Sequence, residues 1–286
     1  MKNTLIAAFF FLGSCKSTDS INRFAKSAAS GTSELNRSSF GFGQFCKVYD
    51  PATLGQLTDT SLYAKATHPV IPCSDYKTSD SLLQIINQTL GNYFFLLQAV
   101  SDKKLLAYNA RPLVSSLADI QHRLLPALSF SDEKITAVKG LLNTLLNEPL
   151  NYYRAGKLKK IMQKNDTVLA TVIRGYEFIL DAALQGEIDQ ATANYRSFVY
   201  ARLFEWSKTA VEKAFVNNRY IEFLKAMDEE RQKIRKSVRL LATIRKDHHL
   251  LAFEKEKKDF RETESEIAQD IIQINNLIEE IIRLTK

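Results

Sequence analysis

The last hundred residues of this chain, 187–286, contain neither glycine nor proline. Average usage would place about twelve of these two residues in a segment of this length. Both disfavour the interior of a helix, so their absence predicts long α-helices. One unbroken helix would be about 150 Å long. We therefore expect breaks, with Asn217-Asn218 and Lys246-Asp247-His248-His249 as the candidates.

Apolar residues recur at heptad spacing on both sides of the second candidate break. One set, interrupted by Arg231, consists of Tyr220, Leu224, Met227, Ile234, Val238 and Leu241. The other set, spaced alternately by four and three residues, consists of Ile267, Ile271, Ile274, Ile278 and Ile281. Leu241 and Ile267 are 26 residues apart, two short of four heptads, so one continuous coiled coil would lose its phase. A coiled-coil hairpin or a kinked pair fits better, with the isoleucine seam packed inside the chain or against a second copy.

The preceding region also has the periodicity of amphipathic helices. It predicts helices at about 51–66, 79–97, 113–124, 131–148 and 161–186, the last of which ends at Gly186. Alternating strand patterns are absent. We therefore expect an all-α fold, an extended multi-helix bundle in which a helical domain at 46–186 precedes the long helices of 187–286.

The N-terminus has the pattern of an export signal. Met1-Lys2 supplies a short positive start, Leu5–Leu12 is an apolar run, and small residues with a cysteine follow it. These three parts are typical of a secretory signal. The stretch Leu12-Gly13-Ser14-Cys15 also resembles the lipobox of bacterial lipoprotein precursors.

The resemblance implies that residues 1–14 are a signal peptide and that Cys15 carries the acyl chains, such as palmitate, of a lipid anchor. The protein would then be exported and held on a bacterial membrane, since more than one acyl chain gives stable anchoring. Lys16, in place of an acid, resembles the pattern that directs lipoproteins to the outer membrane. An ordinary signal peptide cleaved near Ser14 and an uncleaved apolar N-terminus are the alternatives.

The segment that follows, residues 15–45, is rich in serine, threonine and glycine. This composition predicts a flexible tether between the anchor and the folded domain. If Cys15 is lipidated, Cys46 and Cys73 remain as an even pair in an oxidising compartment, and we expect a disulfide between them. Two buried free thiols are the alternative.

No catalytic or ligand-binding motif is found: the sequence has no P-loop, no G-x-S-x-G elbow and no H-E-x-x-H. His248 and His249 would point about 100° apart on a helix, and we interpret them as part of a solvated helix break. Asp119 and His122 share a helix face, but a second such pair is absent. We expect no cofactor, no metal and no catalytic residue, although a site assembled from distant positions would leave no local motif.

The chain is basic, with a formal net charge of +7. Without nucleic-acid-binding motifs, anionic lipid or cell-wall polymer is the expected counterpart of that charge. Arg231, Arg235 and Arg239 form an i, i+4, i+8 row that could contact an acidic partner, and a solvated face is the alternative. Eight aromatic residues crowd positions 195–223 on more than one helix face. Core packing accounts for most of them, and a partner-binding or membrane-touching surface for the rest.

Together these features predict a non-catalytic, lipid-anchored envelope protein that acts as an α-helical interaction or scaffold module. Its expected partners are the membrane, an unknown envelope protein or a second copy of itself through the isoleucine seam, and not nucleic acid. A membrane-active helical protein that inserts or forms pores is the second hypothesis. An envelope enzyme with a site invisible in the sequence is the third.

Overall fold

The computed structural model describes residues 4–38, 40–43, 45, 76–101, 154–253 and 260–285. It leaves the side chains of residues 4–17 and 154–157, and a few others within the helices, undescribed. Nearly all of the described residues are helical, and no strand occurs among them. The prediction of an all-α fold is therefore confirmed.

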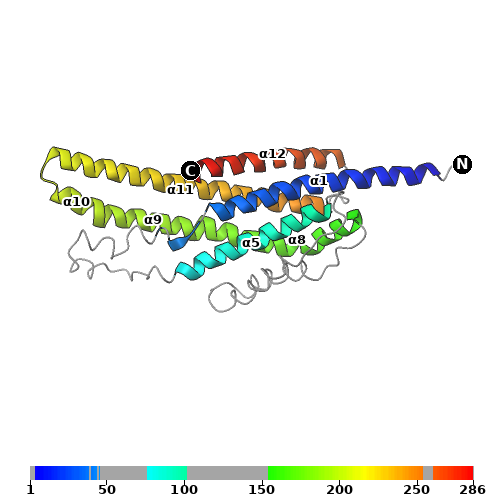
Figure 1. The fold of residues 1–286 in the computed structure, drawn as a ribbon, viewed down its shortest axis with the longest axis horizontal. Helices are drawn as coiled ribbons and strands as arrows, with labels where there is room; N and C mark the ends of the chain where they lie inside the picture. The colour runs from blue at the N-terminus through cyan, green and yellow to red at the C-terminus, as the bar shows by residue number, and fades with distance from the viewer. Residues whose placement is uncertain are drawn as a thin grey trace.

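The helices form an elongated bundle in which long elements run roughly side by side (Figure 1). The α-helices are α1 (Thr4–Arg37), α5 (Tyr76–Ser101), α8 (Arg154–Phe178), α9 (Gln185–Asn194), α10 (Ala201–Trp206), α11 (Ala210–Phe253) and α12 (Phe260–Thr285). Two π-helical turns, η1 (Ile179–Leu184) and η2 (Tyr195–Tyr200), join α8, α9 and α10 into one continuous arm. The arm turns at residues 207–209, α11 returns along it, and α12 folds back on α11.

The hairpin turn between α10 and α11 lies at one end of the molecule, and the N-terminus lies at the other (Figure 1). Helices α1, α8 and α12 pack against α11, and α5 packs on α1 and α8, so these helices together form the body of the bundle. The described helices α9, α10 and the first half of α11 extend beyond that body. The hairpin end is therefore held away from the start of α1.

Helix α1 contradicts the predicted tether. Residues 18–38 are helical or form its last turn, and they pack against α5, α8, α11 and α12. Ile21, Phe24, Ala25 and Ala28 are buried in the core. The flexible tether expected for residues 15–45 is therefore wrong over this stretch.

The serine- and glycine-rich composition of α1 serves close helix packing instead. Two buried hydroxyl groups bond back to helix carbonyls: Thr32 Oγ1 donates to the Ala28 carbonyl at 3.0 Å, and Ser38 Oγ donates to the Glu34 carbonyl at 2.9 Å. The buried hydroxyl of Ser20 has no hydrogen-bond partner in the described structure. Gly31 faces α11, where an added Cβ would lie 3.3 Å from the side chain of Leu240. Small residues let the two helix backbones approach, so a composition typical of a tether here lines a helix–helix contact.

The helix breaks also differ from those predicted. Gly186 does not end a helix, because α9 continues through it. Asn217-Asn218 and Lys246-Asp247-His248-His249 both lie inside α11. The chain reverses instead at Ser207, whose backbone is extended.

A capping box sets the start of α11. Glu212 accepts hydrogen bonds from the backbone N–H groups of Lys208 and Thr209 at 2.8 and 2.9 Å. Thr209 Oγ1 in turn accepts from the Glu212 N–H at 3.2 Å. This reciprocal pattern satisfies N–H groups that the helix itself leaves unpaired. The sequence Thr209-Ala-Val-Glu212 has the pattern of a capping box. It indicates the position of this turn more accurately than the asparagine pair does.

The isoleucine seam of α12 packs within the chain. Ile267, Ile274 and Ile281 are buried, and α12 contacts α11 and α1. Ion pairs from Lys236 to Glu280 and from Lys246 to α12 follow the edge of the same contact. Within the described residues, the seam therefore makes intrachain contacts, and α11 and α12 lie side by side. Self-association through the seam stays a prediction.

Two neighbouring isoleucines of α12 test this packing. Ile274 is fully buried, whereas Ile272 is 61% exposed. We expect Ile274→Ala to lower the free energy of unfolding by about 2–5 kcal/mol, because it leaves a cavity in the core. Ile272→Ala should change it by no more than about 0.5 kcal/mol. Urea denaturation followed by circular dichroism measures both, and equal effects would contradict the assigned register.

Candidate functional site

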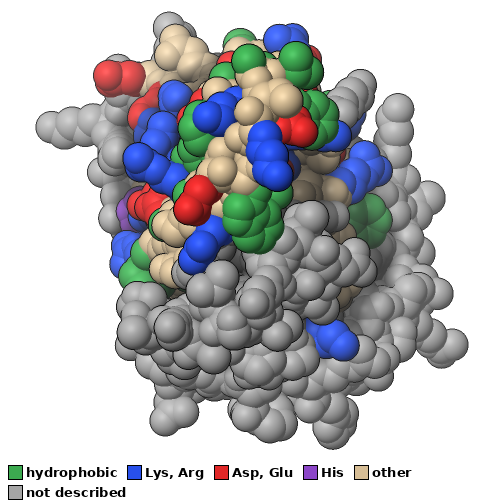
Figure 2. Space-filling model, turned by 90° about the vertical axis from the view of Figure 1, so that its left-hand side faces the viewer, with side chains coloured by type: hydrophobic (Ala, Val, Ile, Leu, Met, Phe, Trp, Pro, Cys, Tyr) green, Lys and Arg blue, Asp and Glu red, His purple; other side chains and the backbone are tan. Residues whose placement is uncertain are grey.

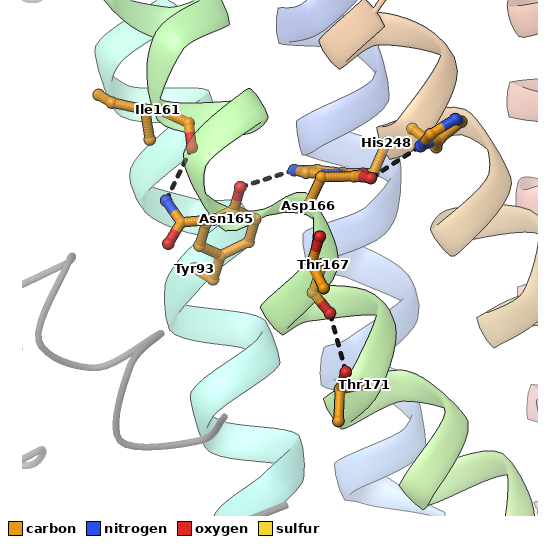
Figure 3. Close-up of polar contacts among 8 residues, drawn as sticks. Tyr93, Ile161, Asn165, Asp166, Thr167, Thr171 and His248 are labelled. Carbon is orange, nitrogen blue, oxygen red and sulfur yellow. Dashed lines mark hydrogen bonds and ion pairs between the residues drawn. The ribbon is translucent and has the colours of Figure 1, made fainter. Parts of the chain in front are cut away.

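A buried polar cluster joins three helices of the bundle (Figure 3). Tyr93 of α5, Asp166 of α8 and His248 of α11 meet in the interior, and the neighbouring His249 reaches Asp166 from the surface. The Tyr93 hydroxyl lies 2.6 Å from His248 Nε2. His248 Nδ1 lies 2.9 Å from one Asp166 oxygen, and His249 Nδ1 lies 2.7 Å from the other. The cluster is therefore a continuous chain of hydrogen bonds from α5 through α11 to α8.

The protonation state of each group follows from its surroundings. Burial raises the pKa of Asp166, but hydrogen bonds from His248 and His249 outweigh burial and hold it below its usual value. The ionised carboxylate can only accept, so the Nδ1 atom of each histidine donates to it. Burial lowers the pKa of His248, which keeps the ring neutral and leaves Nε2 to accept from Tyr93. Burial, followed by the charge of Asp166, raises the pKa of Tyr93 and keeps its hydroxyl protonated.

An O–H group, an imidazole and a carboxylate in a row have the connectivity of a nucleophile, its base and the group that orients the base. Here Tyr93 and His248 are fully buried, and only His249 is open to solvent. A substrate would have to displace core side chains to reach the Tyr93 oxygen. In this arrangement the cluster connects and orients the helices.

The placement of His248 corrects the predicted solvated helix break. Ile244 and Leu251 lie four residues before it and three residues after it, and both are buried. His248 therefore continues the apolar stripe of α11 into the core, while His249 occupies the exposed face. That spacing was visible in the sequence, but its partners Tyr93 and Asp166 lie 155 and 82 residues away and have no local signal.

Asp247 is a second buried ionisable residue, directly before His248. Neither of its carboxylate oxygens has a hydrogen-bond partner in the structure described. Burial, and then the neighbouring carboxyl group of Asp270 on α12, raise the pKa of Asp247 to about 9. The side chain is therefore protonated at neutral pH, which removes the cost of burying a charge.

The basic row on α11 is only partly open to a partner. Arg231 forms an ion pair with Asp189 of α9 at 2.7 Å, so its charge is used within the chain. Arg235 and Arg239 are exposed. Further along α11, Arg245 pairs with Glu177 at 3.4 Å. Because its first member and a later neighbour make intrachain contacts, the row does not form one free binding surface.

Several sequence-predicted residues cannot be placed. Cys15 lies within α1, but its side chain is not among those described. Cys46 and Cys73 fall outside the described residues, so their disulfide stays a prediction. Asp119 and His122 also fall outside them.

The aromatic cluster of residues 195–223 holds the two arms of the α10–α11 hairpin together. Tyr195 stacks on Phe223 with ring centroids 4.0 Å apart, and Tyr200 stacks on Tyr220 at 4.3 Å. Phe204 lies next to Tyr200 at 5.7 Å. Stacked rings add to the stability that apolar burial alone provides. The ladder of rings therefore fixes the hairpin as one rigid unit.

Large apolar side chains are exposed at the hairpin turn and, at Ile221, beside the ladder. The exposed fractions are 48% for Trp206, 79% for Val211, 61% for Phe215 and 62% for Ile221. We call these four residues the hairpin tip. Figure 2 views the molecule from this end and shows hydrophobic side chains set among basic and acidic side chains. A cluster of large exposed apolar residues marks an interaction surface more often than scattered single ones do.

Comparisons with protein-family models, curated proteins and solved structures find no match to this chain. Among the described residues, no group of three or more His, Cys, Asp and Glu side chains is placed to hold a metal ion. Within that same part of the chain, none of the helices is both long and apolar enough to cross a membrane. The function is therefore inferred from burial, contacts and charge.

Replacing Asp247 by Asn tests its protonation. The folded protein keeps this proton up to about pH 9, whereas the unfolded chain releases it near pH 4. The stabilising contribution is therefore complete below pH 4 and is lost as the pH rises towards 9. Because Asn stays neutral, we expect Asp247→Asn to raise the free energy of unfolding at pH 7 by about 1–4 kcal/mol.

The difference between the variant and the native protein should shrink towards zero near pH 4 and grow as the pH rises. Asn at the exposed Asp181 serves as the control and should leave the pH profile unchanged. Denaturation curves at several pH values supply the measurement. A difference that does not vary with pH would show that Asp247 is ionised in the folded protein.

Proposed function

We propose that this chain is a lipid-anchored bacterial envelope protein that acts as a non-catalytic α-helical interaction module. The observation that carries the proposal is the hairpin tip, where Trp206, Val211, Phe215 and Ile221 are exposed on a rigid support. When a partner covers such exposed side chains, each one contributes about 1.5–3 kcal/mol to binding. The core of the protein itself does not have to change. The tip is therefore the contact surface of the proposed module.

The position of Cys15 supports a particular orientation. Thr18, three residues later, is already buried against the bundle, so little free chain separates the proposed anchor from the folded body. At no more than about 3.6 Å per residue, those three residues reach about 11 Å. The start of α1 would then stand close to the anchoring membrane, and the hairpin tip, at the opposite end in Figure 1, would point away from it.

The buried cluster complements this role. A module with a contact surface at one end and an anchor at the other needs a stiff body. The stiff body keeps the contact surface at a fixed position relative to the anchor. Tyr93, Asp166 and His248 tie α5, α8 and α11 together in that body with fixed hydrogen-bond directions. Such a network stabilises one arrangement of helices because any slip leaves buried polar groups unpaired.

Site-specific photo-crosslinking in a bacterial envelope tests the module. A photoreactive amino acid at Phe215 should yield discrete adducts with an envelope component. The same group at the exposed Arg235, on the body portion of α11, should yield few. The pair also separates the tip from the basic row, because adducts from position 235 alone would overturn the assignment to the tip.

The anchor is tested in the same cells by labelling with an alkyne fatty acid. We expect the native chain to carry the label and Cys15→Ala to lose both the label and its membrane retention. An unlabelled native chain would contradict the anchored part of the proposal. Adducts at position 215 would still support the interaction module.

A further inference from the structure

The hairpin tip has the chemistry of a membrane-surface contact. We infer that it docks on the headgroup region of an anionic phospholipid bilayer that faces the end of the molecule opposite the anchor, with Trp206, Val211 and Phe215 inserted and basic side chains against the phosphates. This inference rests on the proposed function, because it names the partner of the same surface. Three properties of the tip carry it: its shape, its charge and its rigidity.

The apolar side chains stand at the convex end of a narrow hairpin. Trp206 is the last residue of α10, Val211 is the second residue of α11, and Phe215 follows one turn later. They flank the turn at residues 207–209 from both arms. A convex end with large side chains on both sides of a turn can enter a fluid headgroup layer directly, whereas a protein partner would need a matching groove. Aromatic side chains are also the residues that favour the boundary between headgroups and hydrocarbon.

Basic side chains surround the same end. Positions 195–223 contain five Lys and Arg residues and three Glu residues. Glu212 is engaged by the backbone N–H groups of the capping box, and Glu222 pairs with Arg219 at 3.5 Å. Lys208 lies in the turn itself and is exposed. Glu212 keeps its negative charge within the capping box, and Glu205 lies beside Trp206, so the net charge of positions 195–223 is +2. This positive balance complements the phosphates of anionic lipid.

Two of the basic side chains lie along aromatic rings. Lys213 Nζ is 5.3 Å from the centroid of the Phe204 ring, and the Arg219 guanidinium is 5.5 Å from that of Phe215. In each pair the charged end of the basic side chain lies over the ring, which is a cation–π contact. A flexible side chain of this kind can turn from the ring to a phosphate when the ring enters the membrane.

The tip is preorganised for contact. The capping box of Thr209 and Glu212 fixes the turn, and the Tyr200 hydroxyl donates to Asn217 Oδ1 across the two arms at 2.8 Å. The exposed side chains are therefore displayed on a scaffold that needs no further ordering. Preorganisation lowers the entropic cost of binding.

The single tryptophan of the chain reports on this contact directly, because Trp206 lies at the tip. The full-length protein is mixed with vesicles of phosphatidylglycerol and phosphatidylcholine, or of phosphatidylcholine alone, that contain brominated acyl chains. We expect a blue shift and quenching of the Trp206 emission on the anionic vesicles and little change on the neutral ones. Because the readout is local to position 206, a lipid or apolar segment at the N-terminus does not produce it.

Three variants sharpen the test. Phe215→Ala should weaken apparent partitioning onto anionic vesicles by about tenfold, from lost apolar burial. The double variant Lys208→Glu and Lys213→Glu should weaken it by at least about tenfold. Ile272→Ala removes an equally exposed apolar side chain from α12, outside the tip, and should partition like the native protein.

Unchanged Trp206 emission on anionic vesicles would overturn the inference, as would equal partitioning by all three variants. Failure here is distinguishable from failure of the proposed function. Protein adducts from position 215 together with silent vesicles would leave the interaction module intact and assign the tip to a protein partner. If position 215 gives no adducts and the vesicles give no response, the tip is not a contact surface.

Discussion

Helix α1 is the constraint on which the bundle depends, because it contacts α5, α8, α11 and α12. Its buried face combines a few large apolar side chains, such as Phe24 and Leu35, with alanine, serine and glycine. The large residues fill the core, and the small ones let neighbouring backbones approach, as at Gly31 against Leu240. Without this helix, the apolar faces of α5 and α12 would lose their main common neighbour. The helical body that supports the hairpin would then lack the helix that contacts all of its other members.

Polar groups in the core fix the position of each packed helix along its neighbours. Apolar contacts tolerate small shifts of one helix along another, but the hydrogen bonds from Tyr93 through His248 to Asp166 do not. The protonation of Asp247 avoids a buried charge between α11 and α12. The interior is thus neutral at Asp247, and the charge of Asp166 is held by hydrogen bonds from His248 and His249. The hairpin tip is the opposite case, since its large apolar side chains are about half or more exposed in the described structure.

Much of the architecture follows from local patterns. The glycine- and proline-free stretch predicts long helices, and the isoleucine spacing of α12 identifies its buried face, because both depend on neighbouring residues. The predictions that were wrong concern sequence features that are compatible with two different structures. Small polar residues in a segment are typical of a tether when they face water and of close helix packing when they are buried, as Ser20, Ser27 and Thr32 are in α1. His248 is typical of a solvated break until a tyrosine 155 residues away is placed against it. Such pairings depend on tertiary contacts, which a single sequence does not contain.

The central claim, that residues 18–37 are a core helix and not a tether, is tested most directly by native-state hydrogen exchange on the full-length protein. The slowest amides of a bundle exchange only through global unfolding. We predict that the amides around Phe24 and Ala28 belong to that slowest class, together with those around Ile244 in α11. Exchange of residues 18–37 at the rate of an unstructured chain, with α11 still protected, would contradict the account.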